Sequence, residues 1–230
     1  MTTRKKSPYF NSPPSKKQKS SKPKRLADEF FSAHSTEELA KGLLGKYLCR
    51  RVEDSVLKAL IVETEAYVGV EDHASFSYGG RRTEANEPMY MSAGTCFTKF
   101  TYGMYYCFNI SSKDNGGAIL VRAADPIEGI EKMCQLRRQH PKAPKNDSFT
   151  ENPHQLASGP SKLCIAFAID ASLNKANILD DPAIWIEDSG QVYGDEDIVK
   201  ATRVGISQKN PWANRLLRFY LKDFKSVSKK

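Results

Sequence analysis

The chain lacks the features that mark membrane and secreted proteins. None of its apolar runs approaches the ~20 residues needed to span a bilayer, and no signal-peptide pattern opens it. Its five cysteines are an odd number and form no C-x-x-C pair, which argues against a full disulfide framework and against a zinc site of standard spacing. We expect a soluble intracellular protein whose cysteines are mostly buried, reduced thiols.

Acidic residues are missing from the first 26 positions, which hold nine lysines and arginines. The net charge of +8 comes from this segment, since 26 basic residues face 27 acidic ones after Leu26. The body of the chain is therefore nearly neutral. Nucleic-acid binding by the body must be argued from local sites and not from the overall charge.

Residues 1–26 are rich in Ser, Pro and Lys and poor in apolar side chains, so we expect a disordered tail. Its clusters KKQK and KPKR are typical of a nuclear address, read by an import receptor, or of a loose arm that attracts DNA. A solubilising tail without a receptor is the plainer alternative. Because the two clusters are closely spaced, we favour the nuclear address and hence a nuclear location.

Residues 27–230 mix helix and strand patterns without regular βαβ alternation, which predicts a single α+β domain with a mainly antiparallel sheet. Ser35 and Glu38 form a capping box that opens a helix, with Gly45 as its stop. A second helix is expected over 126–139, and SGPSKL opens a third with Ser158 or Ser161 as cap. Strands are expected at 55–68, at 94–112 with a bend at Gly103, at 117–126, and in AIWIED, ATRVGIS and LRFYLK.

The strand in LIVETEAYVG carries Glu63, Glu65 and Tyr67 in alternation with apolar residues. Successive side chains of a strand point to opposite faces, so these three share one face. A partly buried carboxylate beside an aromatic ring can serve as a general base. On the strand alone, a solvated polar face explains the pattern better than the floor of a site.

Aromatic residues crowd the next part of the chain, more densely than the packing of one strand requires. Rings that stack a base or wedge into a duplex are tools of enzymes that act on an extruded nucleotide. Tyr102, beside Gly103, is placed for a protruding tip. Ordinary packing of a sheet remains the alternative for Phe97, Tyr106 and Phe108.

Six segments in this order resemble the alkyladenine (3-methyladenine) DNA glycosylase family: IVETEAYVGVEDHAS, YGGRRT, TYGMYYCFNISS, LVRAADPIEG, SGPSKLC and RVGIS…RFY. The resemblance runs from about Ala27 to Leu221. It implies one mixed domain with a curved antiparallel sheet and neither a metal nor an organic cofactor. It also implies a monofunctional glycosylase of base excision repair, which flips damaged purines, such as alkylated bases, out of double-stranded DNA. A monomer suits such a protein.

The resemblance also assigns roles to residues of this chain. Glu65 would activate the water that attacks the sugar C1′, and Arg122 would help to hold that water with a backbone carbonyl near Val204. Tyr67 would stack on the flipped base, Asn109 would line the pocket, and Tyr102 would fill the gap in the duplex. On this assignment Glu65 and Tyr67 form the floor of a site. The resemblance gives Glu63 no chemical role, and we expect it to make a supporting hydrogen bond.

Two departures from the family pattern bear on the substrate. Phe76 stands where the family usually has a pocket histidine, and it cannot donate the imidazole hydrogen bond. Lys99 stands where the family has a second pocket tyrosine. A charged lysine would repel cationic bases that an aromatic box attracts, so we expect weaker action on cationic than on neutral lesions. A buried amine could also form a Schiff base with the sugar, giving a lyase step.

Basic side chains are candidates for phosphate contacts, each with a solvated surface position as the alternative. Lys162 leads, because SGPSKL opens a helix whose N-terminus can itself bind a phosphate, and Arg81 is expected to contact phosphate beside it. The others are Arg82, Arg203, Arg215 and Arg218. A non-catalytic nucleic-acid-binding module of the same fold is the rival interpretation, and Phe76 and Lys99 favour it. A hydrolase of free nucleosides fits the tyrosine wedge poorly.

Overall fold

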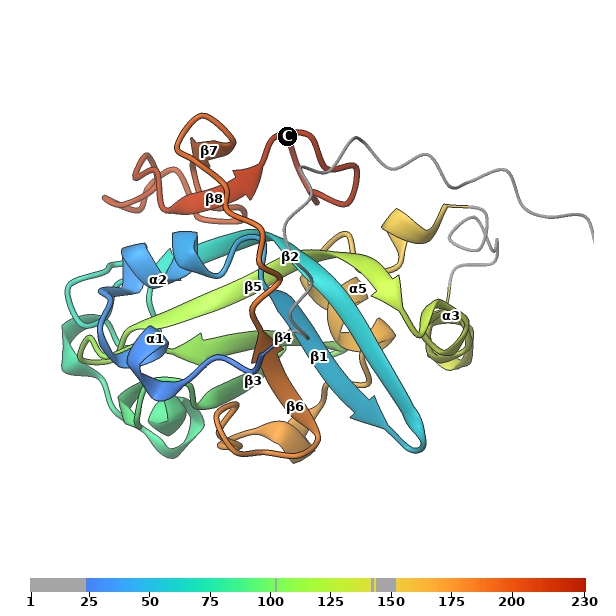
Figure 1. The fold of residues 1–230 in the computed structure, drawn as a ribbon. Coiled ribbons are helices and arrows are strands. Elements are labelled where there is room, and N and C mark those ends of the chain that lie inside the picture. The colour runs from blue at the N-terminus through green and yellow to red at the C-terminus, as the bar shows by residue number, and fades with distance from the viewer. Residues whose placement is uncertain (1–23, 102, 142, 144–151) are drawn as a thin grey trace, which may run out of the picture.

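The computed structural model describes residues 24–101, 103–141, 143 and 152–230. These residues form one curved antiparallel sheet with short helices packed around it (Figure 1), as predicted. Eight strands make up the sheet, in the order β3-β4-β5-β2-β1-β6, with β8 pairing to β2 and β7 to β8. None of the helices within the described ranges is long and apolar enough to cross a membrane.

The central strand is β2, Ser55–Tyr67, which pairs with β1, β5 and β8. The other strands are β1 (Tyr47–Val52), β3 (Cys96–Thr101), β4 (Tyr105–Ser111), β5 (Ala118–Glu128), β6 (Ile184–Glu187), β7 (Ile198–Ala201) and β8 (Arg218–Leu221). Register shifts between β2 and β5 lie at Ile61, Glu63 and Thr64, next to the predicted site. Bulges of this kind bend a strand and redirect its side chains.

The helices are α1 (Asp28–Ser32), α2 (Thr36–Gly42), α3 (Ile130–Gln139) and α5 (Pro160–Ala166). Short 3-10 segments cover Tyr78–Gly80, Glu84–Tyr90, Pro153–Gln155 and Ala171–Leu173. The predicted capping box is confirmed, since Ser35 caps α2 and Glu38 bonds back to it. Thr64 donates to the Ala40 carbonyl at 2.8 Å, so α2 covers the face of β2 opposite Glu65.

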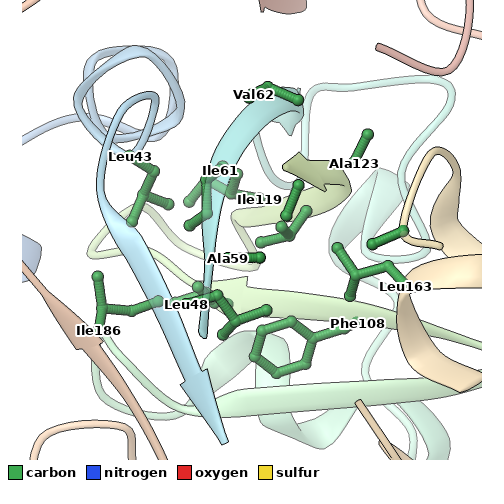
Figure 2. Packing of buried hydrophobic residues seen from close by; sticks show 14 of the residues in the cluster. Leu43, Leu48, Ala59, Ile61, Val62, Phe108, Ile119, Ala123, Leu163 and Ile186 are labelled. Carbon is green, nitrogen blue, oxygen red and sulfur yellow. The ribbon is translucent and has the colours of Figure 1, made fainter. Parts of the chain in front are cut away.

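The core lies between the sheet and these helices (Figure 2). Figure 2 shows Ile61 and Val62 of β2, Ile119 of β5, Phe108 of β4 and Leu163 of α5 among its buried members. Of the five cysteine side chains, Cys107 is partly exposed and the other four are buried, as expected of most of them.

Several boundaries differ from the sequence-based predictions. Helix α2 ends at Gly42 and not at Gly45. The strand expected to end at Pro126 continues to Glu128, because Pro126 falls at a register shift opposite Ala59. The helix expected over 126–139 begins at Ile130, because Gly129 adopts a left-handed φ of 76° and interrupts the backbone. Helix α5 is capped by Gly159, and neither Ser158 nor Ser161 supplies a side-chain cap.

One predicted strand lies elsewhere in the chain, and two elements had no counterpart in the sequence-based predictions. The strand expected in ATRVGIS lies earlier, as β7, and residues 202–206 form a turn. Strand β1 and helix α1 carried no clear pattern in the sequence. Arg25 and Leu26, which the sequence places in the tail, lie against the sheet: Leu26 donates to the Ile186 carbonyl, and Arg25 pairs with Glu187.

Candidate functional site

A cavity of about 440 Å³ opens between strands β2 to β5 and the loops above them. Its volume is in the range of small-molecule sites. Most of its walls are aromatic or apolar, and a few polar groups converge on it. The lining residues that the sequence singled out are Glu65, Tyr67, Phe76, Phe97, Lys99, Asn109, Arg122 and Val204.

Strand register explains why residues so far apart in the chain meet here. Phe97 pairs with Asn109, Asn109 with Leu120, and Leu120 with Glu65. These four side chains therefore form one row across β3, β4, β5 and β2, on the face that lines the cavity. The Asn109 side chain donates to the Phe97 carbonyl at 3.0 Å, which fixes the orientation of its amide.

Glu65 is fully buried at the floor of the cavity, and both of its carboxylate oxygens have partners. Its Oε1 accepts from the Val204 backbone N–H at 2.7 Å and lies 3.2 Å from Nη1 of Arg122. Its Oε2 accepts from the Tyr67 hydroxyl at 2.9 Å. Burial raises the pKa of Glu65, although Arg122 and these two donors favour the ionised form. A carboxylate with a raised pKa is a stronger base.

Glu63 is also fully buried, so the solvated polar face is excluded. Its Oε1 accepts from Nε of Arg122 at 2.9 Å and from Nη1 of Arg218 at 3.0 Å. The expected supporting hydrogen bond is therefore present. Glu63 and Glu65 hold Arg122 between them, and two arginines balance the two carboxylates.

Tyr67 is held by a buried ion pair that sequence reasoning missed. The Arg203 guanidinium lies 4.7 Å from the centre of the Tyr67 ring and donates to the Ala66 carbonyl at 3.0 Å. Asp72 binds Arg203 through both oxygens, and both side chains are fully buried. Residues 72 and 203 are 131 positions apart, so no local pattern could have paired them.

Phe76 and Lys99 lie together in the cavity wall, with the Lys99 amine over the Phe76 ring. Phe76 is 49% exposed, whereas Lys99 is partly buried. Burial, with a contribution from the charge of Arg81, lowers the pKa of Lys99 to about 8. The amine is thus mostly charged at neutral pH and loses its proton in mild base.

The candidate phosphate-binding residues divide into two groups. Arg81, Arg82, Lys162 and Arg215 are exposed. The Lys162 amine lies 3.3 Å from the Ser158 hydroxyl. Arg203 and Arg218 are buried and ion-paired, which contradicts both the phosphate contact and the solvated surface position considered for them. Tyr102, the predicted wedge, lies outside the described residues.

The described residues contain no group of three His, Cys, Asp or Glu side chains able to hold a metal ion. What the cavity does contain is a buried carboxylate–arginine pair beneath aromatic walls. Such an arrangement can activate a water molecule and can stabilise positive charge that develops on a bound group.

Comparison with known proteins gives one family. The family model described as methylpurine-DNA glycosylase matches residues 29–225. A protein of Encephalitozoon cuniculi, named "Probable DNA-3-methyladenine glycosylase", is 46% identical over 192 residues, which are 83% of this chain and 87% of that protein. The human DNA-3-methyladenine glycosylase is 42% identical over 205 residues, 89% of this chain and 68% of the human one. The mouse protein of the same name is 42% identical over 207 residues, 89% of this chain and 61% of its own length.

Proposed function

Since this chain belongs to the methylpurine-DNA glycosylase family and is thus an N-glycosidic bond hydrolase, we propose that it excises damaged purines from double-stranded DNA as a step of base excision repair. The observation that carries the proposal is Glu65, buried at the floor of an aromatic cavity and paired with Arg122. Its substrate would be a single nucleotide extruded from the duplex into the cavity.

In the proposed reaction, Glu65 takes a proton from water as the water oxygen attacks C1′ and the C1′–N bond to the base breaks. The negative charge of Glu65 also stabilises the oxocarbenium character of the sugar. Arg122 holds the attacking water, together with the backbone at Val204, whose N–H already binds Glu65. No covalent intermediate with the protein is required.

The extruded base would lie between Tyr67 and the β3–β4 hairpin. The Arg203 guanidinium behind Tyr67 holds its ring in place for stacking. Asn109, with its amide fixed by the Phe97 carbonyl, would face an edge of the base. Tyr102 would fill the gap in the duplex, and Arg81 and Lys162 would contact phosphates.

Phe76 and Lys99 would narrow the choice of lesion. Lys99 lies on β3, and β4 and β5 separate it from Glu65 on β2, roughly 14 Å along the sheet at ordinary strand spacing. Its amine therefore belongs to the end of the cavity that would hold the base, not the sugar. We expect it to disfavour cationic lesions such as 7-methylguanine relative to neutral ones such as hypoxanthine and ethenoadenine. The same placement argues against a Schiff base at C1′.

Single-turnover excision tests the proposed function. Duplexes that contain one hypoxanthine, ethenoadenine or 7-methylguanine are mixed with excess protein, with Glu65→Gln as the matched control. We expect release of the base by the natural chain and a loss of at least about 100-fold in Glu65→Gln. Lesion binding without release of the base from any duplex would favour the non-catalytic module, the interpretation that Phe76 and Lys99 support. Borohydride added during the reaction should trap no protein–DNA adduct.

The tail, residues 1–26, supports a location in the nucleus through KKQK and KPKR. A fluorescent fusion of the whole chain should accumulate in nuclei, and glutamine replacement of the lysines of KKQK and of Lys22 should disperse it. Lys24 and Arg25 are kept, because both bond to the folded body. We propose that the protein acts on DNA as a monomer. Sedimentation of the purified chain, alone and with a lesion duplex, measures this directly.

A further inference from the structure

Residues 226–229 lie against the back of the Glu63–Arg122 pair; we name them the 226–229 strap. Ser226 is fully buried, donates its hydroxyl to Asp125 of β5, and is followed by Val227 in the core. The Ser228 backbone N–H donates to Oε2 of Glu63 at 2.6 Å. The Lys229 carbonyl accepts from Nη1 of Arg218 at 2.7 Å. The family match ends at residue 225, so the strap lies outside it.

Ser228 also touches Arg122 directly. The three nitrogens of that guanidinium have three different partners: Nε donates to Glu63 at 2.9 Å, Nη2 donates to the Ser228 hydroxyl at 3.1 Å, and Nη1 faces Glu65 at 3.2 Å. A guanidinium is a rigid planar fork. Two fixed nitrogens therefore fix the position of the third, which is the one that contacts Glu65.

We propose that Ser228 is a positioning residue for the glycosylase reaction, which through the 226–229 strap sets the guanidinium of Arg122 against the carboxylate of Glu65. The inference rests on the proposed function of that site. Ser228 itself touches neither the cavity nor the reacting atoms. It acts by holding Arg122, and errors of about 1 Å in such a group can slow a reaction by up to roughly 100-fold.

The charged and titratable groups around Glu65 define what removal of the Ser228 hydroxyl would change. Arg122 faces Glu65 from β5, Glu63 and Tyr67 share its strand, and Cys107 interacts with it from β4. Arg203 lies 4.7 Å from the centre of the Tyr67 ring, and Arg218 of β8, which pairs with Glu65 in the strand register, directs its guanidinium to Glu63. Among these groups the contact of Arg122 favours ionised Glu65 most directly. Loosening of Arg122 would therefore raise the pKa of Glu65 further.

The test uses Ser228→Ala, with Ser228→Thr as the variant that keeps the hydroxyl. Ser32→Ala is the matched control, because the Ser32 hydroxyl is exposed and bonds only within α1. Three quantities are measured for each: single-turnover excision of hypoxanthine against pH, the Kd for the lesion duplex, and titration of the Glu65 carboxyl carbon by NMR. The NMR titration reports on the positioning of Arg122 whether or not the base is released.

We expect Ser228→Ala to excise roughly tenfold more slowly at neutral pH, with an unchanged Kd. The acidic limb of its rate profile and the Glu65 carbon titration should both move to higher pH. Ser228→Thr and Ser32→Ala should follow the natural chain. Ser228→Ala could instead lower the melting temperature while the acidic limb of the rate profile and the Glu65 carbon titration stay at the same pH. That result would show a merely structural role and overturn the inference. A natural chain that releases no base, yet shows the titration difference, would instead overturn the proposed function and leave the positioning intact.

Discussion

Glu65 combines full burial with a raised pKa, and this combination affects stability as well as chemistry. A carboxyl whose pKa is raised by folding binds its proton more tightly in the folded state. The stabilisation that it gives is complete below its unfolded pKa and is lost as the pH rises through its folded pKa. An ionised Glu65 carboxylate therefore lowers the free energy of unfolding, which is the cost of the buried base that we propose.

Replacement of Glu65 by glutamine should relieve that cost, because Arg122 keeps the Glu63 carboxylate as its counter-charge. The amide keeps the shape of the side chain, its oxygen can accept from Val204, and its NH₂ can donate to the Tyr67 oxygen. We expect Glu65→Gln to have a higher free energy of unfolding than the natural chain at neutral pH. The difference should shrink as the pH falls through the raised pKa of the folded carboxyl, and it should vanish below the ordinary pKa of an unfolded glutamate, about 4.3. Urea titrations at a series of pH values measure it, and a difference that grows on acidification would contradict the argument.

Lys99 gives a second prediction at the scale of one residue, which rests on the proposed substrate. Its lowered pKa of about 8 means that the ammonium predominates below that pH and the neutral amine above it. The penalty on a cationic base should therefore weaken as the pH rises through about 8. In Lys99→Met the charge is absent at every pH, so excision of 7-methylguanine should rise roughly tenfold at neutral pH.

The measurement compares Lys99→Met with the natural chain on the same duplex at each pH, so that ionisation of the lesion itself cancels. For 7-methylguanine the ratio of rates should fall towards one above pH 8, whereas for hypoxanthine it should show no such trend. Lys132→Met, on α3 and away from the cavity, controls for the loss of a lysine. A rate ratio for 7-methylguanine that does not change with pH would show that the charge of Lys99 does not set the choice of lesion.

At the scale of elements, the turn at 202–206 completes the site by bringing Val204 to Glu65, and the Asp72–Arg203 pair anchors it. Both side chains of the pair are fully buried, so removal of the carboxylate charge leaves an arginine without its counter-charge. We expect Asp72→Asn to lower the free energy of unfolding by about 3 kcal/mol. Excision should fall as well, because the turn and the ring of Tyr67 lose their support.

The chain offers a matched exposed pair as the control. Arg82 binds Glu87 through both oxygens, as Arg203 binds Asp72, but the Arg82 side chain is 57% exposed. Solvent screens such a pair, so Glu87→Gln should leave the denaturation midpoint almost unchanged. Equal effects of the two substitutions would show that burial does not set the strength of these ion pairs. Chemical denaturation of both variants under one condition makes the comparison.

The two arginine pairs also show what a sequence can and cannot predict. The capping box at Ser35, the alternation in β2 and the hairpin bend at Gly103 are local patterns, and each gave the correct element. The burial of Glu63 and Glu65 depends on partners far along the chain. So do the Arg203–Asp72 pair and the Ser228 contact with Arg122, which join residues more than 100 positions apart. The family motifs located the carboxylate at residue 65, but they carried no information on what holds Arg122 from behind.

For the molecule as a whole, charge is divided between a nearly neutral body and a basic tail. Residues 1–23 hold seven lysines and arginines and no acidic residue. A body with so little net charge gains little from general attraction to DNA. The tail should therefore supply most of the non-specific affinity, by displacing counterions from the phosphates.

Removal of the tail should weaken DNA binding and flatten its dependence on salt. The deletion is best made at residues 1–23, because Lys24, Arg25 and Leu26 pair with the strand β6 region and belong to the folded body. Each phosphate contact contributes about 0.9 to the slope of log K against log salt. Seven contacts therefore limit the change in slope to roughly 6, and engagement of about half of them predicts about 3.

Binding to undamaged duplex between low and moderate salt measures the slope. A full-length variant with glutamine at the seven basic positions separates charge from chain length and should match the deletion. An unchanged slope in both would assign the non-specific affinity to Arg81, Lys162 and other exposed cations of the body.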